Sequence, residues 1–215
     1  MKVGVLALQG DFEEHIAVLR RLGVSAVEVR LPEELHGIDG VIIPGGESTT
    51  ISRLLRQWGL LEPLRERAQN GLALWGTCAG AILLAERAPG LDCDGLRLMD
   101  IAVERNAFGR QVDSFEVDLT VPALGPEPFR AVFIRAPLIS HVGPKAQPLA
   151  SLADGAVVAA RQGRLLATAF HPELTDDARF HQYFLDLAAA SPGKDGASSP
   201  TRSSERPTPA RRRHD

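Results

Sequence analysis

The chain has 215 residues, of which 44% are hydrophobic and 24% charged, and its formal net charge is −3. This length and apolar content suffice for one domain with a substantial core, and no apolar run approaches the roughly 20 residues that a membrane-spanning helix needs. The acidic balance disfavours a nucleic-acid-binding protein. Two cysteines are too few for a disulfide framework, so we expect a reducing, cytoplasmic setting, and no Cys/His spacing predicts a metal site.

Strand and helix patterns alternate through the first half of the chain. Apolar strands are predicted at residues 2–8, 24–30 and 40–44, and amphipathic helices at 11–22 and 60–70, with another helix after Ser48. The latter is expected to begin at Ser48 or Thr49 as N-cap and to place Ile51, Leu54, Leu55 and Trp58 on one face. This alternation predicts a mainly parallel sheet with helices on its faces.

The loop Pro44–Thr50, with the sequence Pro-Gly-Gly-Glu-Ser-Thr-Thr, follows the third predicted strand. A glycine pair there exposes backbone N–H groups that can hold an anion or a developing oxyanion. On its own the loop would be interpreted as a tight turn. In an open α/β sheet it emerges at the carboxyl edge, which is where ligands bind.

The segment Gly71–Leu84 predicts a short buried strand, a sharp turn and a small-residue helix. Its turn places Cys78 between Gly76 and Gly80, which is the spacing of a nucleophile elbow with cysteine in place of serine. The two glycines leave room for neighbouring backbone where side chains would clash. The alternative is that Cys78 is a small core residue after a buried strand, as many lone cysteines are.

The second half of the chain is expected to be richer in antiparallel pairing, with strands at residues 96–103, 114–121, 129–134, 156–161 and 165–170. The polar loop between the first two carries two arginines and a phenylalanine, so it is either a carboxylate-binding loop or a surface turn. Thr175 is predicted to cap the last helix, with Asp176 and Asp177 in its first turn. Its buried face is predicted to contain Phe180, Phe184 and Leu187.

His171 and Glu173 follow the last predicted strand, with Pro172 between them. This spacing lets the carboxylate contact one ring nitrogen and leaves the other facing a nucleophile, so a cysteine triad is predicted. The remaining histidines are interpreted as solvated or hydrogen-bonded spectators, and they are His15, His36, His141, His181 and His214. Cys93, in an acidic loop without a nearby base, is interpreted as incidental.

The residues divide into a domain at 1–190 and a tail at 191–215. The tail is rich in Ser, Pro and Arg, carries six basic and three acidic residues and has no large apolar side chain. Such a composition cannot bury a core, so the tail is predicted to be disordered.

Gly76-Thr77-Cys78-Ala79-Gly80 together with His171-Pro172-Glu173 resembles the triad of class I glutamine amidotransferases. Further motifs narrow this resemblance to the glutaminase subunits of two-component pyridoxal 5′-phosphate synthases. The similarity runs in register over about residues 1–189. The motifs that carry it are Leu8–His15, Pro44–Thr50, Glu104–Gln111 and Phe133–Pro137.

The resemblance implies a three-layer α/β fold with a mainly parallel central sheet, helices on both faces, additional antiparallel strands and a nucleophile elbow. It implies that Cys78 attacks the amide of L-glutamine, that His171 is the general base and acid, and that Glu173 orients His171. The backbone N–H groups of Gly46 and Ala79 would form the oxyanion hole. The implied substrate contacts are Gly46, Glu47, Ser48, Arg105, Ile134 and Arg135. Which of the two arginines pairs with the α-carboxylate stays open.

The resemblance also implies a partner. In the family, ammonia passes to a barrel-shaped synthase subunit within a hetero-oligomeric complex that assembles the vitamin B6 cofactor, and the glutaminase is weak until it docks. The segment Gln9–His15 is our expected docking face. No cofactor, metal, nucleic acid or membrane is implied for this chain.

Two other functions fit parts of the pattern. One is another cysteine-triad enzyme of this architecture, such as a γ-glutamyl hydrolase or a glutaminase that feeds a different synthase, which the Gly-Gly-Glu-Ser-Thr-Thr and Arg-Asn-Ala-Phe-Gly-Arg motifs disfavour. The other is a non-catalytic regulatory subunit. The presence of all three triad residues, Cys78, His171 and Glu173, disfavours that function.

Overall fold

The computed structural model describes residues 1–91, 94–105 and 114–190. The predicted disordered tail, Cys93 and most of the Glu104–Gln111 motif lie outside the described residues. The α-helices are α1 Phe12–Arg21, α2 Ser48–Gln57, α3 Leu61–Gln69, α4 Ala79–Leu84 and α5 Arg179–Ala189. The strands are β1 Lys2–Leu6, β2 Ser25–Val29, β3 Gly40–Ile43, β4 Ala73–Thr77, β5 Ala85–Arg87, β6 Met99–Glu104, β7 Ser114–Leu119, β8 Phe129–Ile134, β9 Leu138–Val142, β10 Gln147–Ser151, β11 Val157–Gln162 and β12 Leu165–Thr168.

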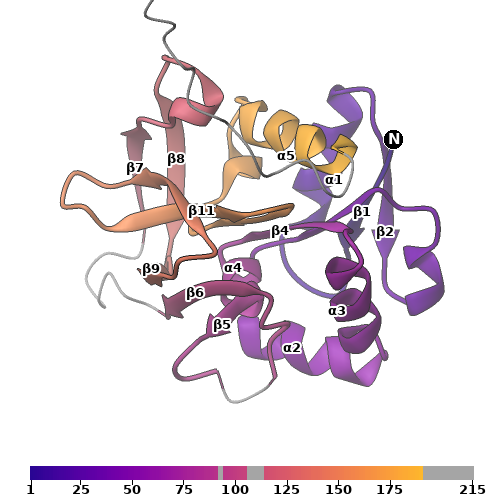
Figure 1. Ribbon diagram of the computed structural model, residues 1–215. Helices are drawn as coiled ribbons and strands as arrows, with labels where there is room; N and C mark the ends of the chain where they lie inside the picture. Colours follow the sequence, from indigo (N-terminus) through magenta and orange to yellow (C-terminus); the bar gives the residue numbers. More distant parts are fainter. Residues whose placement is uncertain (92–93, 106–113, 191–215) are drawn as a thin grey trace, which may run out of the picture.

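A mixed central sheet runs through the molecule in the order β2-β1-β3-β4-β12-β11-β9-β6-β5, with β10 paired to β11 (Figure 1). The strands from β2 to β12 along this order are parallel to one another. The pairs β11–β12, β9–β11 and β6–β9 are antiparallel, and β7 and β8 form a separate antiparallel pair. The predicted parallel first half and the more antiparallel second half are therefore both confirmed.

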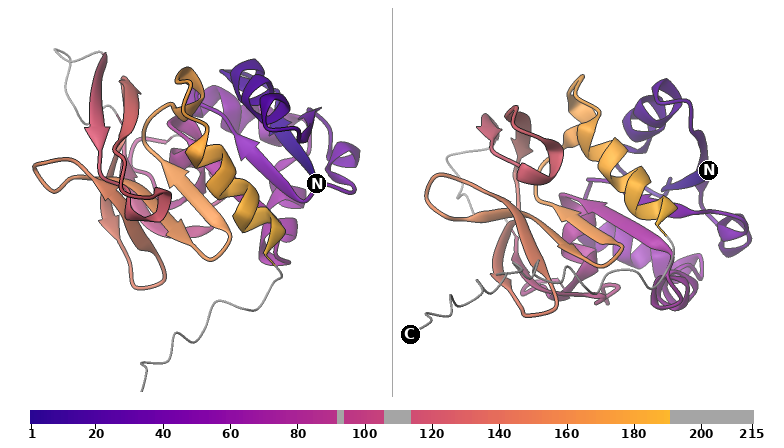
Figure 2. Two further views of the ribbon diagram at one scale, coloured as in Figure 1. Left: turned by 90° about the horizontal axis from the view of Figure 1, so that it is seen from above. Right: turned by 45° about the horizontal axis from the view of Figure 1, so that its top comes forward.

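The helices cover both faces of the parallel part of the sheet, as Figures 1 and 2 show. Alternate residues of one strand point to opposite faces, so Val41 and Ile43 of β3 join the core under α2, α3 and α4. Ile42 of the same strand joins the core under α1 and α5, together with Trp75 of β4. A strand buried on both faces has to be apolar throughout, which is why these segments read as continuous hydrophobic runs.

Two helices begin at residues other than those predicted. The N-cap of α2 is Glu47, whose carboxylate accepts hydrogen bonds from the backbone N–H groups of Thr49 and Thr50 at 3.1 and 2.7 Å. Helix α5 begins only at Arg179, and its N-cap is Ala178. Thr175 was the wrong choice of cap because its hydroxyl donates to the carbonyl of Pro172 at 3.2 Å, closing the turn that follows His171.

Two further predictions about the elements are wrong. Trp58 lies just past the end of α2 and is 47% exposed, so it does not share the buried face of Ile51 and Leu55. The sequence also fails to predict β5, β9 and β10. Strand β9 contains Ser140 and His141, and β10 contains Pro148, which is tolerated because β10 pairs with β11 alone among the described strands.

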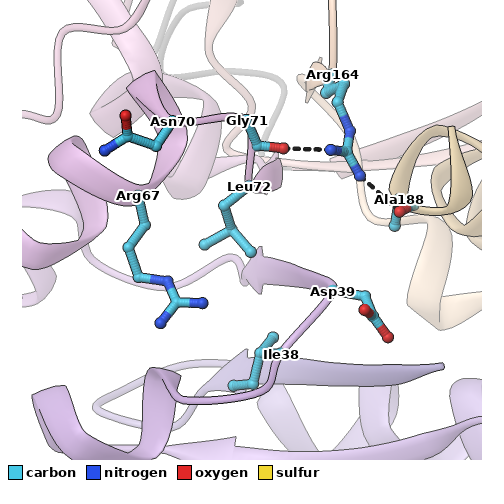
Figure 3. Close-up of a pocket in the computed structure, with 8 residues that line it drawn as sticks. All are labelled: Ile38, Asp39, Arg67, Asn70, Gly71, Leu72, Arg164 and Ala188. Atoms are coloured by element: carbon cyan, nitrogen blue, oxygen red, sulfur yellow. Dashed lines mark hydrogen bonds between the residues drawn. The ribbon is translucent and has the colours of Figure 1, made fainter. Parts of the chain in front are cut away.

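The amino end of β4 is tied to the end of α5 by Arg164 (Figure 3). Its guanidinium donates to the carbonyls of Gly71, Leu187 and Ala188, the last two at 3.0 and 2.5 Å. A surface hollow beside these contacts is lined by Arg67 and Asn70 among others. Because the guanidinium of Arg164 donates to these three carbonyls, it fixes the start of β4, and the other end of β4 leads to Cys78.

None of the helices in the described part of the chain is both long and apolar enough to cross a bilayer.

Replacing Phe180 with alanine should lower the free energy of unfolding by about 3–5 kcal/mol. The side chain is wholly buried and its ring packs against Trp75, Phe129 and Phe170, with centroid separations of 6.4, 4.8 and 5.3 Å. Urea denaturation would measure the change. Trp58→Ala is the matched control: a larger aromatic side chain is removed from the surface, and the expected change is within about 0.5 kcal/mol.

Candidate active site

Cys78 sits on a strained turn between β4 and α4, with φ 47° and ψ −104°. The turn is possible only because its flanking glycines lack side chains. A Cβ atom on Gly76 would lie 2.3 Å from the carbonyl carbon of Gly80, and one on Gly80 would lie 2.1 Å from the carbonyl oxygen of Ile43. The predicted nucleophile elbow is therefore present, and the unfavourable backbone conformation of Cys78 is of the kind found at functional sites.

His171 reaches Cys78 because β12 and β4 are parallel neighbours in which Thr168 pairs with Thr77. The chain leaves both strands at the same edge, and the backbone N–H of His171 is anchored by the carbonyl of Val132 at 2.8 Å. A 3₁₀ turn at Pro172–Leu174 then brings Oε1 of Glu173 to 2.7 Å from Nδ1 of His171. The neighbouring Cys78 also contributes to the raised pKa of this imidazole.

The electrostatic surroundings favour a positively charged His171. Burial alone would lower its pKa, but hydrogen bonds with Asp11, Cys78 and Glu173 outweigh burial and raise the pKa to about 12. For Glu173, burial raises the pKa, and the hydrogen bond from His171 offsets only part of that effect. An imidazolium beside a cysteine is the setting in which the reactive thiolate is stabilised.

Asp11 is a site residue that sequence reasoning did not single out. Its Oδ2 atom lies 3.4 Å from Nδ1 of His171, and donor atoms of Asp11, His171 and Glu173 all lie within 4.8 Å of one another. Such a grouping has the donor types of a metal site. A cationic imidazole between two carboxylates accounts for the same geometry.

One cavity contains nearly all of the predicted site residues. It has a volume of about 550 Å³, and Cys78 and His171 contribute to its wall. Glu173 lies behind His171 and is buried. The other predicted residues that line the cavity are Gly46, Glu47, Ser48, Ala79, Arg105, Ile134 and Arg135. The structure thus brings together predicted residues from five separate stretches of chain.

The loop with Gly46 is held from two sides. The backbone N–H of Glu47 donates to the side-chain carbonyl of Gln9 at 2.8 Å, and a Cβ atom on Gly46 would lie 2.5 Å from that same oxygen. Burial raises the pKa of the Glu47 carboxyl, but the combined hydrogen bonds from Thr50 and Thr49 lower it overall. Glu47 is therefore an ionised anchor at the cavity wall.

The two candidate arginines differ in how they are held. Arg105 donates to the carbonyl of Gly90 at 2.7 Å and to Oε1 of Glu47 at 3.1 Å, so its guanidinium is oriented. Arg135 is exposed and has a positive φ of 43°, next to Ile134, which is 40% exposed. Arg105 is thus preorganised in the wall, whereas Arg135 and Ile134 form its exposed rim.

The interpretation of the other histidines as spectators holds for two that are exposed, His36 and His141. His15 and His181 are wholly buried and are hydrogen-bonded to each other, as the second part of that interpretation expects. Nε2 of His15 lies 3.3 Å from Oε2 of Glu173, on the side away from His171. The burial of His15 could have been predicted from its spacing. It precedes Leu19 by four residues and Leu22 by seven, so it lies on the inner face of the predicted helix.

Comparison with known proteins identifies the family. Residues 5–189 match the family model described as "SNO glutamine amidotransferase family". The chain belongs to the SNO glutamine amidotransferase family. The family assignment agrees with the elbow, the histidine-carboxylate pair and the cavity described above.

Among curated relatives in this amidotransferase family, two are named pyridoxal 5′-phosphate synthase subunit PdxT. The one from Herpetosiphon aurantiacus is 62% identical over 190 residues, and the one from Roseiflexus sp. is 60% identical over 189 residues. Each alignment covers 87% of this chain and 100% of the relative.

Solved structures agree with the family assignment. A crystal structure described as a glutamine amidotransferase superposes with a TM-score of 0.83 at 53% identity, covering 87% of this chain and 99% of that one. The structure of PurLQS from Thermotoga maritima gives a TM-score of 0.64 at 14% identity, covering 86% of this chain and 97% of that one. At that identity the likeness shows the shared fold alone.

The buried histidine pair should make the protein less stable as the pH falls from about 6.5 to 5. Burial lowers the pKa of His15 well below its usual value, and burial with the nearby charge of Arg21 lowers the pKa of His181 to about 3. The unfolded chain binds these protons and the folded chain does not, so stability is complete above pH 6.5 and declines by about 1.4 kcal/mol per pH unit for each histidine. The raised pKa values of His171 and Glu173 act in the opposite direction, because the folded chain holds these two protons more tightly than the unfolded chain, and for His171 this effect fades below about pH 6 as the unfolded imidazole also becomes protonated.

Urea unfolding at several pH values would measure this slope for the wild type and for His181→Phe. Phenylalanine suits the site because the His181 ring packs edge-on against Trp75 at 4.8 Å. In His181→Phe the free energy of unfolding should depend less steeply on pH, by about 1.4 kcal/mol per pH unit. His36→Asn, at an exposed site, should leave this dependence unchanged. Equal slopes in all three proteins would contradict the prediction.

Proposed function

We propose that this chain is the glutaminase subunit of a pyridoxal 5′-phosphate synthase. In this proposal it hydrolyses L-glutamine to L-glutamate and ammonia through a thioester on Cys78. The observation that carries the proposal is the alignment of Cys78, His171 and Glu173 beside a cavity whose wall includes an oriented arginine. The names of the relatives that are about 60% identical support the identity of the synthase.

The reaction follows from the positions of these groups. His171 holds the proton that the thiol of Cys78 gives up, and the resulting thiolate attacks the side-chain amide carbon of glutamine. The negative charge that forms on the amide oxygen is stabilised by the backbone N–H groups of Gly46 and Ala79. His171 then gives its proton to the departing nitrogen, ammonia leaves, and a water molecule hydrolyses the thioester to release glutamate and restore the thiol.

Glu173 and Asp11 support the proton transfers. Glu173 accepts the Nδ1–H of His171, which keeps the other ring nitrogen directed at Cys78. Asp11 adds a second carboxylate 3.4 Å from the same nitrogen. Together they favour the imidazolium that exists after His171 has taken the proton.

The cavity fits an α-amino acid with a carboxylate at one end. Arg105 and Arg135 supply positive charge at the wall and rim, and a guanidinium pairs with both oxygens of a carboxylate. Glu47 and Ser48 would contact the substrate from the loop that carries Gly46. The oriented guanidinium of Arg105 makes it the better candidate for the α-carboxylate.

The proposed partner is a synthase subunit that receives the ammonia in a hetero-oligomeric complex. Gln9 supports a docking face at residues 9–14, because its side chain holds the loop that contains Gly46. Contact with Gln9 would thus reach the proposed oxyanion hole through one hydrogen bond. His15 is buried and cannot be part of that face. The proposal includes a cytoplasmic location, which the low number of cysteines supports.

Glutamate release from L-glutamine, measured with and without the cognate synthase subunit, tests this function. The wild type should release glutamate faster with the subunit present, and Cys78→Ala should reduce the rate by at least about 1,000-fold because no thioester can form. If the wild type released no glutamate in the presence of the subunit, the proposal would be contradicted. Binding of the variant to the subunit serves as the control for folding.

Replacement of Arg105 by glutamine should raise KM for glutamine about 10- to 100-fold and change kcat much less. Removal of a charge-assisted pair with the α-carboxylate weakens the substrate and the transition state by a similar amount, about 1.5–3 kcal/mol. Arg135→Gln is the matched control, and steady-state kinetics of both variants provide the comparison. If Arg135→Gln alone raised KM, the carboxylate contact would belong to Arg135.

A further inference from the structure

A line of buried polar side chains continues behind Glu173, away from the cavity. It joins Glu173 to His15 on α1, and His15 to Thr77 on β4 and His181 on α5. These side chains come from both the sheet and the helical layer above it, and every one is buried. The reaction proposed above uses only the first member of this line.

The second carboxylate oxygen of Glu173 is the feature that requires an explanation. Oε1 accepts from His171, whereas Oε2 makes no well-aligned hydrogen bond within the described residues and its side chain is 0% exposed. A buried carboxylate oxygen without a donor costs free energy that folding has to offset. Nε2 of His15 lies 3.3 Å from Oε2, which is within reach of a donor after a small adjustment.

Whether His15 can act as that donor depends on which of its nitrogens carries the proton. Nδ1 of His15 is 3.0 Å from Nε2 of His181, and one of the two must donate. If His181 donates, Nδ1 of His15 is the acceptor and its Nε2 carries the hydrogen. That hydrogen then faces Oε2 of Glu173 and the hydroxyl oxygen of Thr77, which is also 3.3 Å away.

The opposite arrangement is less favourable. If His15 donated from Nδ1, its Nε2 lone pair would face the carboxylate oxygen at 3.3 Å, and the two would repel. His181 would then carry its hydrogen on Nδ1, a buried atom without a hydrogen-bond partner in the described part of the chain. A buried N–H without an acceptor is rare in folded proteins.

We propose that His15 is a positioning residue, which donates from Nε2 to the second carboxylate oxygen of Glu173 and is held in that tautomer by His181. This inference rests on the proposed glutaminase function. By fixing both oxygens, His15 sets the plane of the carboxylate that meets His171. It also favours the ionised form of Glu173, which His171 needs when it takes the proton from Cys78.

A packing role alone does not account for His15. Its ring lies edge-on to Trp75 at 5.6 Å, among apolar neighbours of α1 that would suit a leucine or methionine equally well. A neutral imidazole there has to be stripped of water, at a free-energy cost that only a polar contact offsets. The polar contacts available to its Nε2 are those with Glu173 and Thr77.

The test compares His15→Met with His15→Gln in the complex with the synthase subunit. Methionine fills a similar volume without a donor, whereas the glutamine amide reaches about as far as Nε2 and retains an N–H. His15→Met should lower kcat for glutamate release about 10- to 100-fold, with KM within twofold, because a misplaced catalytic group slows the reaction without weakening binding. His15→Gln should retain kcat within about fivefold of the wild type.

Leu19→Met, on the same buried face of α1 but without a polar contact, is the control and should leave kcat unchanged. Thermal unfolding of each variant separates misfolding from misplacement. A folded His15→Met with wild-type kcat, or a folded His15→Gln that loses kcat, would overturn the inference. An inactive wild type would instead overturn the proposed function, so the two failures are distinguishable.

Discussion

The parallel pairing of β4 with β12 is the contact on which the site depends. These strands are separated by about 90 residues in the sequence, yet Thr77 and Thr168 are in register. That register fixes the positions of Cys78 and His171, which lie one residue and three residues beyond the paired threonines. A shift of one residue would turn every side chain of a strand to the opposite face. The continuous apolar core on both faces of β4 therefore also fixes the chemistry at its end.

The polar layer at this edge is held within an otherwise apolar interior. Cys78, His171 and Glu173 are all nearly buried, and each depends on a neighbour for its orientation. The backbone of Val132 holds His171, His171 holds Glu173, and the glycines on either side of Cys78 hold the elbow. Preorganisation of this kind avoids rearrangement during the reaction, which is the main advantage of a fixed polar site over water.

Much of this arrangement could be predicted from the sequence because it is encoded locally. The elbow needs two glycines at fixed spacing, and the histidine-carboxylate pair needs a proline turn, so Cys78, His171 and Glu173 stand out without a structure. The apolar runs of β1, β3 and β4 likewise predict buried parallel strands. The family resemblance supplied the substrate-contact residues, and the structure places all of these along one cavity.

The remainder depends on contacts that spacing does not encode. Glu47 rather than Ser48 caps α2, since its longer side chain reaches back to the free N–H groups. Asp11 and His15 belong to the start of α1, which follows β1 and is distant in sequence from β4 and β12. Their contacts with His171 and Glu173 become visible only when α1 is packed on the sheet. Strands β9 and β10 are short and contain Ser140, His141 and Pro148, which interrupt the apolar pattern that predicts a strand.

Glu47 has two tasks at once, and this affects how its variants are interpreted. The same carboxylate caps the N-terminus of helix α2 and orients the guanidinium of Arg105. A substitution there would fray the first turn of α2 and release the arginine together, so two apparently separate properties share a single cause. Loss of activity in a Glu47 variant could not then be assigned to a missing substrate contact. Only a residue that restores the cap without reaching Arg105, such as aspartate, would separate the two.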